Sequence, residues 1–332
     1  MIKFNIKTYN FKMMEVKIMK LGFLTGIMGD VSIYEKIEWA SKIGFKTLEV
    51  SCWPRVNTRD YSGSDIDVVN FTKEEADRLN AFLKEKDMTI ATLAYYDNNL
   101  DHNLERRKGY NNHLIKVIEA AALLGVKNVG TFIGRDMTLP IEDNFDEMEK
   151  VFKPILEYAK EKNVRIIIEN CSMPGWHESG WAGTISYSPE LWDEMFKRLP
   201  YDNFGLNYDP SHLVWLGIDY LEGLKNYKNR IFQVHAKDTE VFHDKLKNCY
   251  SIFGKQLNRK DNWDMGYWRH RMPGKGDIDW DKFMAVLKEI GYDNEVIIEH
   301  EDLEYQDTLE KVKEGLTLGL SLIHISEPTR PY

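Results

Sequence analysis

The run KIGFKTLEV (residues 42–50) contains a pattern that recurs along the chain. It joins the end of an apolar-periodic helix to a glycine, a short loop and an apolar strand. The same order appears in LLGVKNVGT (123–131) and EIGYDNEVII (289–298). Glycine readily adopts the left-handed backbone conformation that ends many helices. The chain is therefore predicted to consist of repeated strand–helix units.

Strand-like and helical segments alternate over most of the chain. Strands are predicted at 20–26, 47–53, 89–96, 128–134, 165–170, 204–210, 231–238 and 295–302. Apolar residues spaced by three and four positions predict helices at 32–44, 72–87, 106–125, 144–163 and 278–291. Eight units over roughly 300 residues are typical of a single-domain (β/α)8 TIM barrel. An open doubly wound sheet is the alternative, but no GxGxxG motif follows the first strand.

Both ends of the chain are expected to lie outside a barrel that spans 19–320. Residues 1–18 precede the first predicted strand and contain further methionines that are alternative starts, so they are interpreted as an N-terminal extension. The segment SLIHISEPTRPY (321–332) interrupts an amphipathic helix and resembles a translated sequencing adapter. It is therefore interpreted as an artefactual tail.

The overall composition limits the classes of function. Of 332 residues, 43% are hydrophobic and 29% are charged, which is typical of a globular protein. A net charge of −9 disfavours attraction to phosphate backbones, so no nucleic-acid partner is expected. The chain has no run of about 18 apolar residues, so no membrane-spanning helix is predicted. Three cysteines without a CxxC pair indicate a reducing compartment, and we expect a cytoplasmic protein.

Acidic residues and histidines follow the last four predicted strands. They are Glu169, then Asp209 with His212 close behind it, then His235, and finally Glu299. The functional groups of a TIM barrel come from the C-terminal ends of its strands, so these side chains are expected to converge at one mouth. Alternation along VIIEHED places Glu299 and Glu301 on one face of the last strand.

Taken singly, these residues have ordinary explanations. A glutamate can be a solvated strand end, Asp209 a helix N-cap, and His235 a hydrogen-bonded core histidine. Four such residues at the same end of successive strands favour a shared role. Three carboxylates this close would repel one another without a cation. With one imidazole they suit a single divalent metal ion, Mn²⁺ first, with Mg²⁺, Co²⁺ and Zn²⁺ as alternatives.

From residue 20 to about 318 the chain resembles the xylose-isomerase-like TIM barrels of the sugar phosphate isomerase/epimerase family, which includes ketose 3-epimerases and inosose dehydratase. The motifs that carry this resemblance are IIIEN (166–170), NYDPSHL (207–213), VHAKD (234–238), RMPGKGDIDW (271–280) and IIEHED (297–302). The resemblance implies that Glu169, Asp209, His235 and Glu299 bind the metal. It also implies that the two glutamates exchange the substrate proton and that His212 contacts the substrate. Lys237 and Arg271, which lie in these motifs, are expected substrate contacts as well.

Proton abstraction next to a carbonyl requires a base within reach and stabilisation of the developing enolate oxygen. A divalent metal can supply that stabilisation. The expected function is therefore a metal-dependent sugar isomerase or epimerase that works through a metal-bound enediolate. A lyase or dehydratase acting on a keto-sugar or keto-inositol shares the enolising step, so this alternative stays open. A non-catalytic sugar-binding barrel also stays open. A related endonuclease is disfavoured because the chain has Tyr95 and Tyr96 where further histidines would be needed.

Two long aromatic segments are expected to form loops over the C-terminal mouth. One covers 171–189 and contains Trp176, and the other lies between His235 and Glu299. Aromatic faces pack against sugar rings, so these loops are expected to form a lid over a small-molecule sugar or polyol substrate larger than a free triose, and Trp176 is a candidate contact. Aromatic loops also form subunit interfaces, which leaves a homo-oligomer open.

Three further expectations concern the pocket lining. The ketose epimerases have an arginine shortly after the metal-binding histidine, where this chain has Val241, so Arg269 or Arg271 is the expected substitute. Glu49 and Trp53 close the second predicted strand and are weaker candidates for contacts with substrate.

Overall fold

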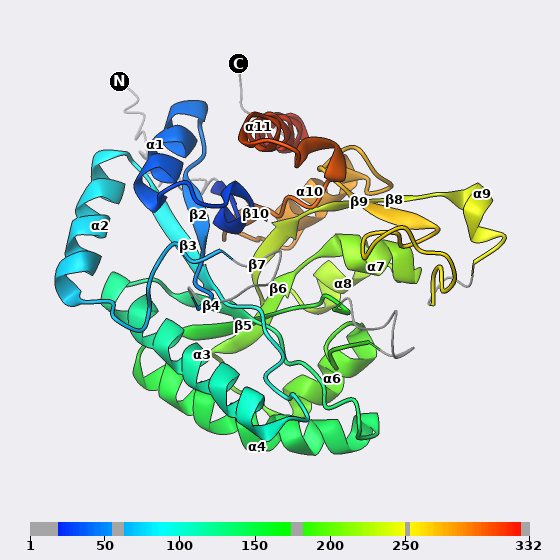
Figure 1. The fold of residues 1–332 in the computed structure, drawn as a ribbon, viewed down its shortest axis with the longest axis horizontal. Helices are drawn as coiled ribbons and strands as arrows, with labels where there is room; N and C mark the ends of the chain where they lie inside the picture. The colour runs from blue at the N-terminus through cyan, green and yellow to red at the C-terminus, as the bar shows by residue number, and fades with distance from the viewer. Residues whose placement is uncertain (1–18, 55–62, 174–181, 250–252, 327–332) are drawn as a thin grey trace, which may run out of the picture.

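The computed structural model describes residues 19–54, 63–173, 182–249 and 253–326, and it shows a parallel barrel surrounded by helices (Figure 1). The eight barrel strands follow the order β1-β10-β7-β6-β5-β4-β3-β2. They are β1 (Leu21–Phe23), β2 (Thr47–Ser51), β3 (Thr89–Ala94), β4 (Asn128–Thr131), β5 (Arg165–Glu169), β6 (Phe204–Tyr208), β7 (Ile231–Ala236) and β10 (Val296–Ile298). Each predicted strand contains one of them, and the predicted (β/α)8 barrel is confirmed.

The barrel nearly closes through a short seam between β1 and β2. The Lys46 amide donates to the Leu21 carbonyl at 2.9 Å, and Leu24 forms an isolated parallel bridge with Glu49. Gly22 is needed at this seam because a Cβ atom there would collide with the carbonyl oxygen of Thr47. The seam therefore depends on two backbones that approach too closely for a side chain.

Helices cover the outside of the barrel. The main ones are α1 (Ile33–Ile43), α2 (Lys73–Glu85), α3 (Leu104–Leu124), α4 (Ile141–Glu161), α6 (Pro189–Arg198), α8 (Tyr220–Asn226), α10 (Trp280–Glu289) and α11 (Leu309–Ser326). Helix α1 shows why they begin and end where they do. Ser32 and Glu35 form a reciprocal capping box at its start, and Gly44 ends it with a φ of 110°. Short η1 (Thr25–Met28) follows β1, and α7 (Pro210–Leu216) follows β6.

A two-stranded hairpin extends from the barrel on one side (Figure 1). Strand β8 (Asp238–Val241) pairs antiparallel with β9 (Trp268–Arg271), and α9 (His243–Leu246) follows β8. The rings of Trp215, on α7, and Trp268 stack with centroids 4.7 Å apart. This contact attaches the hairpin to the barrel. The sequence analysis predicted a loop over most of this segment, whereas the structure has ordered strands at both of its ends.

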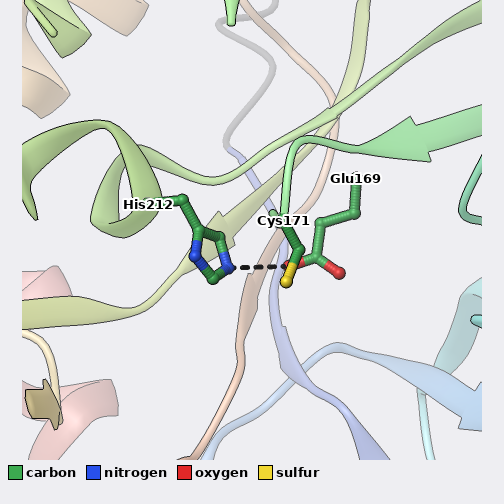
Figure 2. Close-up of side chains that lie close together, drawn as sticks. All are labelled: Glu169, Cys171 and His212. Carbon is green, nitrogen blue, oxygen red and sulfur yellow. Dashed lines mark ion pairs between the residues drawn. The ribbon is translucent and has the colours of Figure 1, made fainter. Parts of the chain in front are cut away.

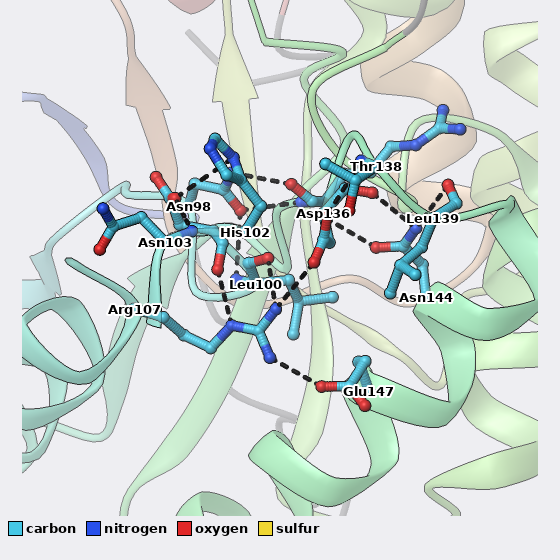
Figure 3. Close-up of polar contacts among 12 residues, drawn as sticks. Asn98, Leu100, His102, Asn103, Arg107, Asp136, Thr138, Leu139, Asn144 and Glu147 are labelled. Carbon is cyan, nitrogen blue, oxygen red and sulfur yellow. Dashed lines mark hydrogen bonds and ion pairs between the residues drawn. The ribbon is translucent and has the colours of Figure 1, made fainter. Parts of the chain in front are cut away.

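Arg107 ties together the loops that follow β3 and β4 (Figure 3). Its guanidinium donates to the carbonyls of Leu100 and Asp101 at 3.0 and 2.8 Å. It also pairs with Asp136 at 3.3 Å and with Glu147 of α4 at 2.7 Å. Because this buried cation has partners in both loops and in α4, it fixes the β3 and β4 side of the mouth.

Helix α11 continues beyond the predicted boundary at residue 320. It reaches Ser326, Ile323 is fully buried, and Leu322 lies against the turn at Gly274. The boundary therefore falls inside a packed helix, because Leu322 and Ile323 continue its apolar face. Residues 1–18 and 327–332 lie outside the described residues. In the described ranges, no helix is long and apolar enough to cross a membrane.

Candidate metal centre

Four side chains predicted to bind a metal lie together at the carboxyl ends of neighbouring strands. Glu169 ends β5, Asp209 follows β6, His235 lies near the end of β7, and Glu299 follows β10. Each offers one ligand atom, and these atoms all lie within 4.8 Å of one another. All four residues are at least 95% buried. The order of the strands therefore produces the convergence that was expected from the sequence.

Three atoms at the centre of this group lack a well-formed hydrogen bond. Glu169 Oε1, Asp209 Oδ2 and His235 Nδ1 are buried and have no hydrogen bond of acceptable geometry. His235 Nδ1 lies 3.1 Å from Glu299 Oε2 and 3.6 Å from Glu169 Oε1. Buried lone pairs without a well-formed hydrogen bond cost free energy, which a coordinated cation would recover. Three carboxylates and one imidazole therefore fit a divalent metal ion.

Lys237 is a buried cation directly beside this group. Its Nζ donates to Glu299 Oε2 at 2.6 Å and to Glu301 Oε2 at 2.8 Å. It also lies 3.1 Å from Asp209 Oδ2. Burial alone would lower the pKa of this ammonium group, but the surrounding carboxylates, led by Asp209 and Glu299, raise it well above the usual value. Lys237 is therefore positively charged and partly balances the acidic site.

The two glutamates of the site have different electrostatic environments. Burial and the charge of Glu169 raise the pKa of Glu299 to about 7. Burial also acts to raise the pKa of Glu169, but the imidazoles of His212 and His235 together with Lys237 hold it well below its usual value. Glu299 therefore binds a proton more readily than Glu169 does. Pairs of catalytic carboxylates commonly differ in this way.

Glu49 lies beneath His235, inside the barrel. Its Oε2 is 2.8 Å from His235 Nε2 and accepts from Gln233 Nε2 at 2.6 Å. Its Oε1 accepts from the hydroxyl of Tyr96 at 2.5 Å. Nδ1 of His235 faces Glu169 and Glu299, and Nε2, on the other side of the ring, also lies 2.8 Å from the amide nitrogen of Asn207. The sequence analysis expected Glu49 to contact substrate, and the structure instead places its carboxylate on the far side of a metal-ligand candidate.

His212 and His270 lie at the edge of the group. His212 Nε2 is 3.5 Å from both Glu169 Oε1 and Asp209 Oδ2. The His270 ring lies 5.7 Å from the His212 ring, and its Nε2 is 3.4 Å from Glu301 Oε2. Burial lowers the pKa of His270 to about 3, so this imidazole is neutral. Sequence reasoning missed His270 because it lies on β9, whose pairing with β8 was not predicted.

The other residues predicted to contact substrate are Arg271, Arg269, Trp53 and Trp176. Arg271 makes a two-pronged ion pair with Glu304 of η2 (Leu303–Tyr305), at 2.6 and 3.0 Å. Arg269 pairs with Glu240 at 2.7 Å. Trp53 is buried, with its ring 6.1 Å from that of Tyr96. Trp176 lies outside the described residues.

Comparison with known proteins agrees with this architecture. The chain is 28% identical over 311 residues to the uncharacterized protein YfiH of Bacillus subtilis, covering 86% of this chain and 93% of that one. It is 26% identical over 281 residues to an inosose dehydratase of Clostridium perfringens, covering 78% of this chain and 84% of the relative.

Solved structures show the same fold. The IolI protein with a bound zinc atom has a TM-score of 0.67 at 21% identity, covering 93% of this chain and 99% of IolI. A D-psicose 3-epimerase crystallised with D-fructose has a TM-score of 0.66 at 14% identity, covering 93% and 99%. The family model described as xylose isomerase-like TIM barrel matches residues 37–319. This chain belongs to the xylose isomerase-like TIM barrel family.

Proposed function

We propose that this protein is a divalent-metal-dependent isomerase or epimerase that moves a proton next to the carbonyl of a sugar or polyol. The observation that carries the proposal is the convergence of Glu169, Asp209, His235 and Glu299 at one end of the barrel. Among the ions that suit this ligand set, we propose Mn²⁺. When bound, the metal would supply the positive charge that stabilises an enolate oxygen.

The chain's own side chains are suited to the proton transfers. Glu169 and Glu299 are two carboxylates in one buried site, and each can remove a proton from carbon or return it. Lys237, with Nζ 2.6 Å from Glu299, adds a fixed positive charge where negative charge would develop. His212 and His270, whose rings lie 5.7 Å apart at the edge of the site, would contact substrate hydroxyls.

A lyase or dehydratase is the second candidate, and two observations favour it. The inosose dehydratase relative aligns with 78% of this chain. The Lys237 ammonium could also protonate a leaving hydroxyl, because it lies among the carboxylates that would remove the proton. Both candidates begin by removing a proton from carbon, and they differ in whether a substituent then leaves.

Solvent deuterium uptake tests the shared step and separates the two outcomes. The full chain, loaded with Mn²⁺, is incubated in heavy water with a panel of ketoses, keto-inositols and 3-keto-glycosides. Metal-dependent incorporation of deuterium at carbon without loss of mass as water supports the isomerase or epimerase. Incorporation or proton loss accompanied by loss of water supports the lyase. Tight binding of a sugar without any exchange would indicate a binding protein and contradict the proposal.

Replacement of Glu299 tests the proposed roles of the residues. Glu299→Gln keeps the size of the side chain and removes the base, so exchange should fall by about 10²–10⁴-fold. Metal affinity should fall as well, so exchange is compared at saturating Mn²⁺. Glu161→Gln, on the exposed end of α4, is the matched control and should keep wild-type exchange. Wild-type exchange by Glu299→Gln with metal bound would show that Glu299 is not the base.

A further inference from the structure

A cysteine lies beside the metal group and has no part in the proposed reaction. Cys171 follows Glu169 by two residues, and His212 of α7 faces both of them (Figure 2). Sγ of Cys171, a carboxylate oxygen of Glu169 and a ring nitrogen of His212 all lie within 4.8 Å of one another. Thiolate, carboxylate and imidazole are the three ligand types most common in zinc sites.

His212 is the strongest sign that this second group binds something. It is 97% buried, yet neither of its ring nitrogens has a hydrogen bond of acceptable geometry to the described residues. Oε1 of Glu169, which lies 3.5 Å from His212 Nε2, also lacks such a bond. A buried imidazole aimed at an unsatisfied carboxylate oxygen is costly unless a ligand lies between or beside them.

The backbone around Cys171 also suits a metal-bound sulfur. The amide of Met173 donates to Cys171 Sγ at 3.3 Å. Such a donor stabilises negative charge on sulfur, much as amide groups stabilise other anions. Cys171 is only partly buried.

We propose that Glu169, Cys171 and His212 bind a second divalent cation of the thiol-preferring class, Zn²⁺ or Co²⁺, with Glu169 shared between the two positions. The two positions differ in chemistry. The first offers three carboxylates and an imidazole, which also suit Mn²⁺ or Mg²⁺, whereas sulfur at the second favours softer ions. An ion at the second position would hold His212 and thereby withdraw it from the substrate.

Cobalt provides a direct test because a thiolate bound to Co²⁺ gives a charge-transfer absorption in the near ultraviolet that oxygen and nitrogen ligands do not. The full chain is first saturated with one Mn²⁺ per chain, and Co²⁺ is then titrated. We expect one Co²⁺ to bind in addition and the thiolate absorption to grow with it. A total of one metal ion per chain without this absorption would overturn the proposal.

Two variants and a control assign the absorption to these residues. Cys171→Ser should abolish the thiolate absorption and weaken binding of the additional Co²⁺ at least tenfold, while Mn²⁺ still binds at the first position. His212→Asn should weaken the additional Co²⁺ without removing the sulfur, so it serves as a second test if Cys171→Ser folds poorly. Cys249→Ser replaces another free cysteine and should keep the absorption.

The result is independent of the proposed reaction. Failure of the second site would appear as an absence of thiolate absorption while deuterium exchange with Mn²⁺ persists. Failure of the proposed reaction would appear as an absence of exchange, whatever the Co²⁺ titration shows. Thiolate absorption that survives in Cys171→Ser would assign the sulfur elsewhere and contradict the proposed ligand set.

Discussion

At the scale of single residues, Glu49 is a buried carboxylate that contacts a candidate metal ligand on the side away from the other candidate ligands. It holds Nε2 of His235 at 2.8 Å and is itself fixed by Tyr96 and Gln233. This arrangement holds the ring of His235 so that Nδ1 faces Glu169 and Glu299. Partners of this kind usually matter for metal affinity nearly as much as the ligands do.

Glu49→Gln should therefore weaken Mn²⁺ binding by about 10–100-fold. The amide keeps the size of the side chain but adds a donor that faces the donors of Tyr96 and Gln233. Titration of Mn²⁺ followed by electron paramagnetic resonance measures the affinity directly. Glu161→Gln makes the same chemical change on the surface and should bind Mn²⁺ as the wild type does. Equal affinities of the two variants would show that Glu49 does not orient His235.

Sequence reasoning found the four strand-end residues but misjudged the surroundings of Glu49. Glu169 and Glu299 follow uninterrupted apolar strands, so their position at the mouth could be read from the pattern. Glu49 is the third residue of β2, and the pairing of β2 with β3 shifts register between Leu48 and Glu49. The depth of a side chain in a barrel depends on such shifts, which no single sequence displays.

At the scale of elements, the local sequence pattern was sufficient to predict the barrel strands but not the β8–β9 hairpin. Strand β5 contains three consecutive isoleucines, Ile166–Ile168, and a parallel barrel buries such a run on both faces. Strands β8 and β9 are mostly polar and lie far apart in the sequence, and Trp268 of β9 stacks on Trp215 of α7. His270 reaches the site only through this pairing, which is why it could not be predicted.

Helix α11 provides a prediction about the end of the chain. Ile323 is fully buried, so Ile323→Ala should lower the free energy of unfolding by about 2–5 kcal/mol. Urea denaturation of the full chain measures the change. Ser321→Ala alters the exposed face of the same turn and should change stability by less than about 0.5 kcal/mol. An unchanged midpoint for Ile323→Ala would mean that the helix is not packed at residue 323 in solution.

At the scale of the whole molecule, a buried histidine outside the candidate metal group links stability to pH. His113 of α3 is 9% exposed, with Nε2 2.7 Å from the carbonyl of Cys52 and its ring 4.5 Å from that of Tyr95. Burial lowers its pKa from the usual value of 6.5, although the Cys52 carbonyl opposes this. Below pH 6.5 the unfolded chain therefore binds more protons than the folded one, because the histidine has the higher pKa in the unfolded chain.

His113 should therefore contribute full stability above pH 6.5 and lose it as the pH falls through the lower pKa of the folded state. Its contribution to the slope is at most about 1.4 kcal/mol per pH unit for one proton. His113→Gln should flatten the pH dependence of urea unfolding between pH 7 and 5 by up to about this amount. His243→Gln, whose side chain is 78% exposed, should retain the wild-type dependence. Parallel curves for wild type and His113→Gln would refute the assignment.

The position of Lys237 bears on the order in which the protein is assembled. A barrel that buried three or four carboxylates together without a counter-charge would have to wait for a metal before it could close. The ammonium of Lys237 lies within 3.1 Å of Glu299, Glu301 and Asp209, so the chain carries that counter-charge itself. Folding can then precede metal loading, so the metal-free chain should be able to fold with its acidic site already assembled.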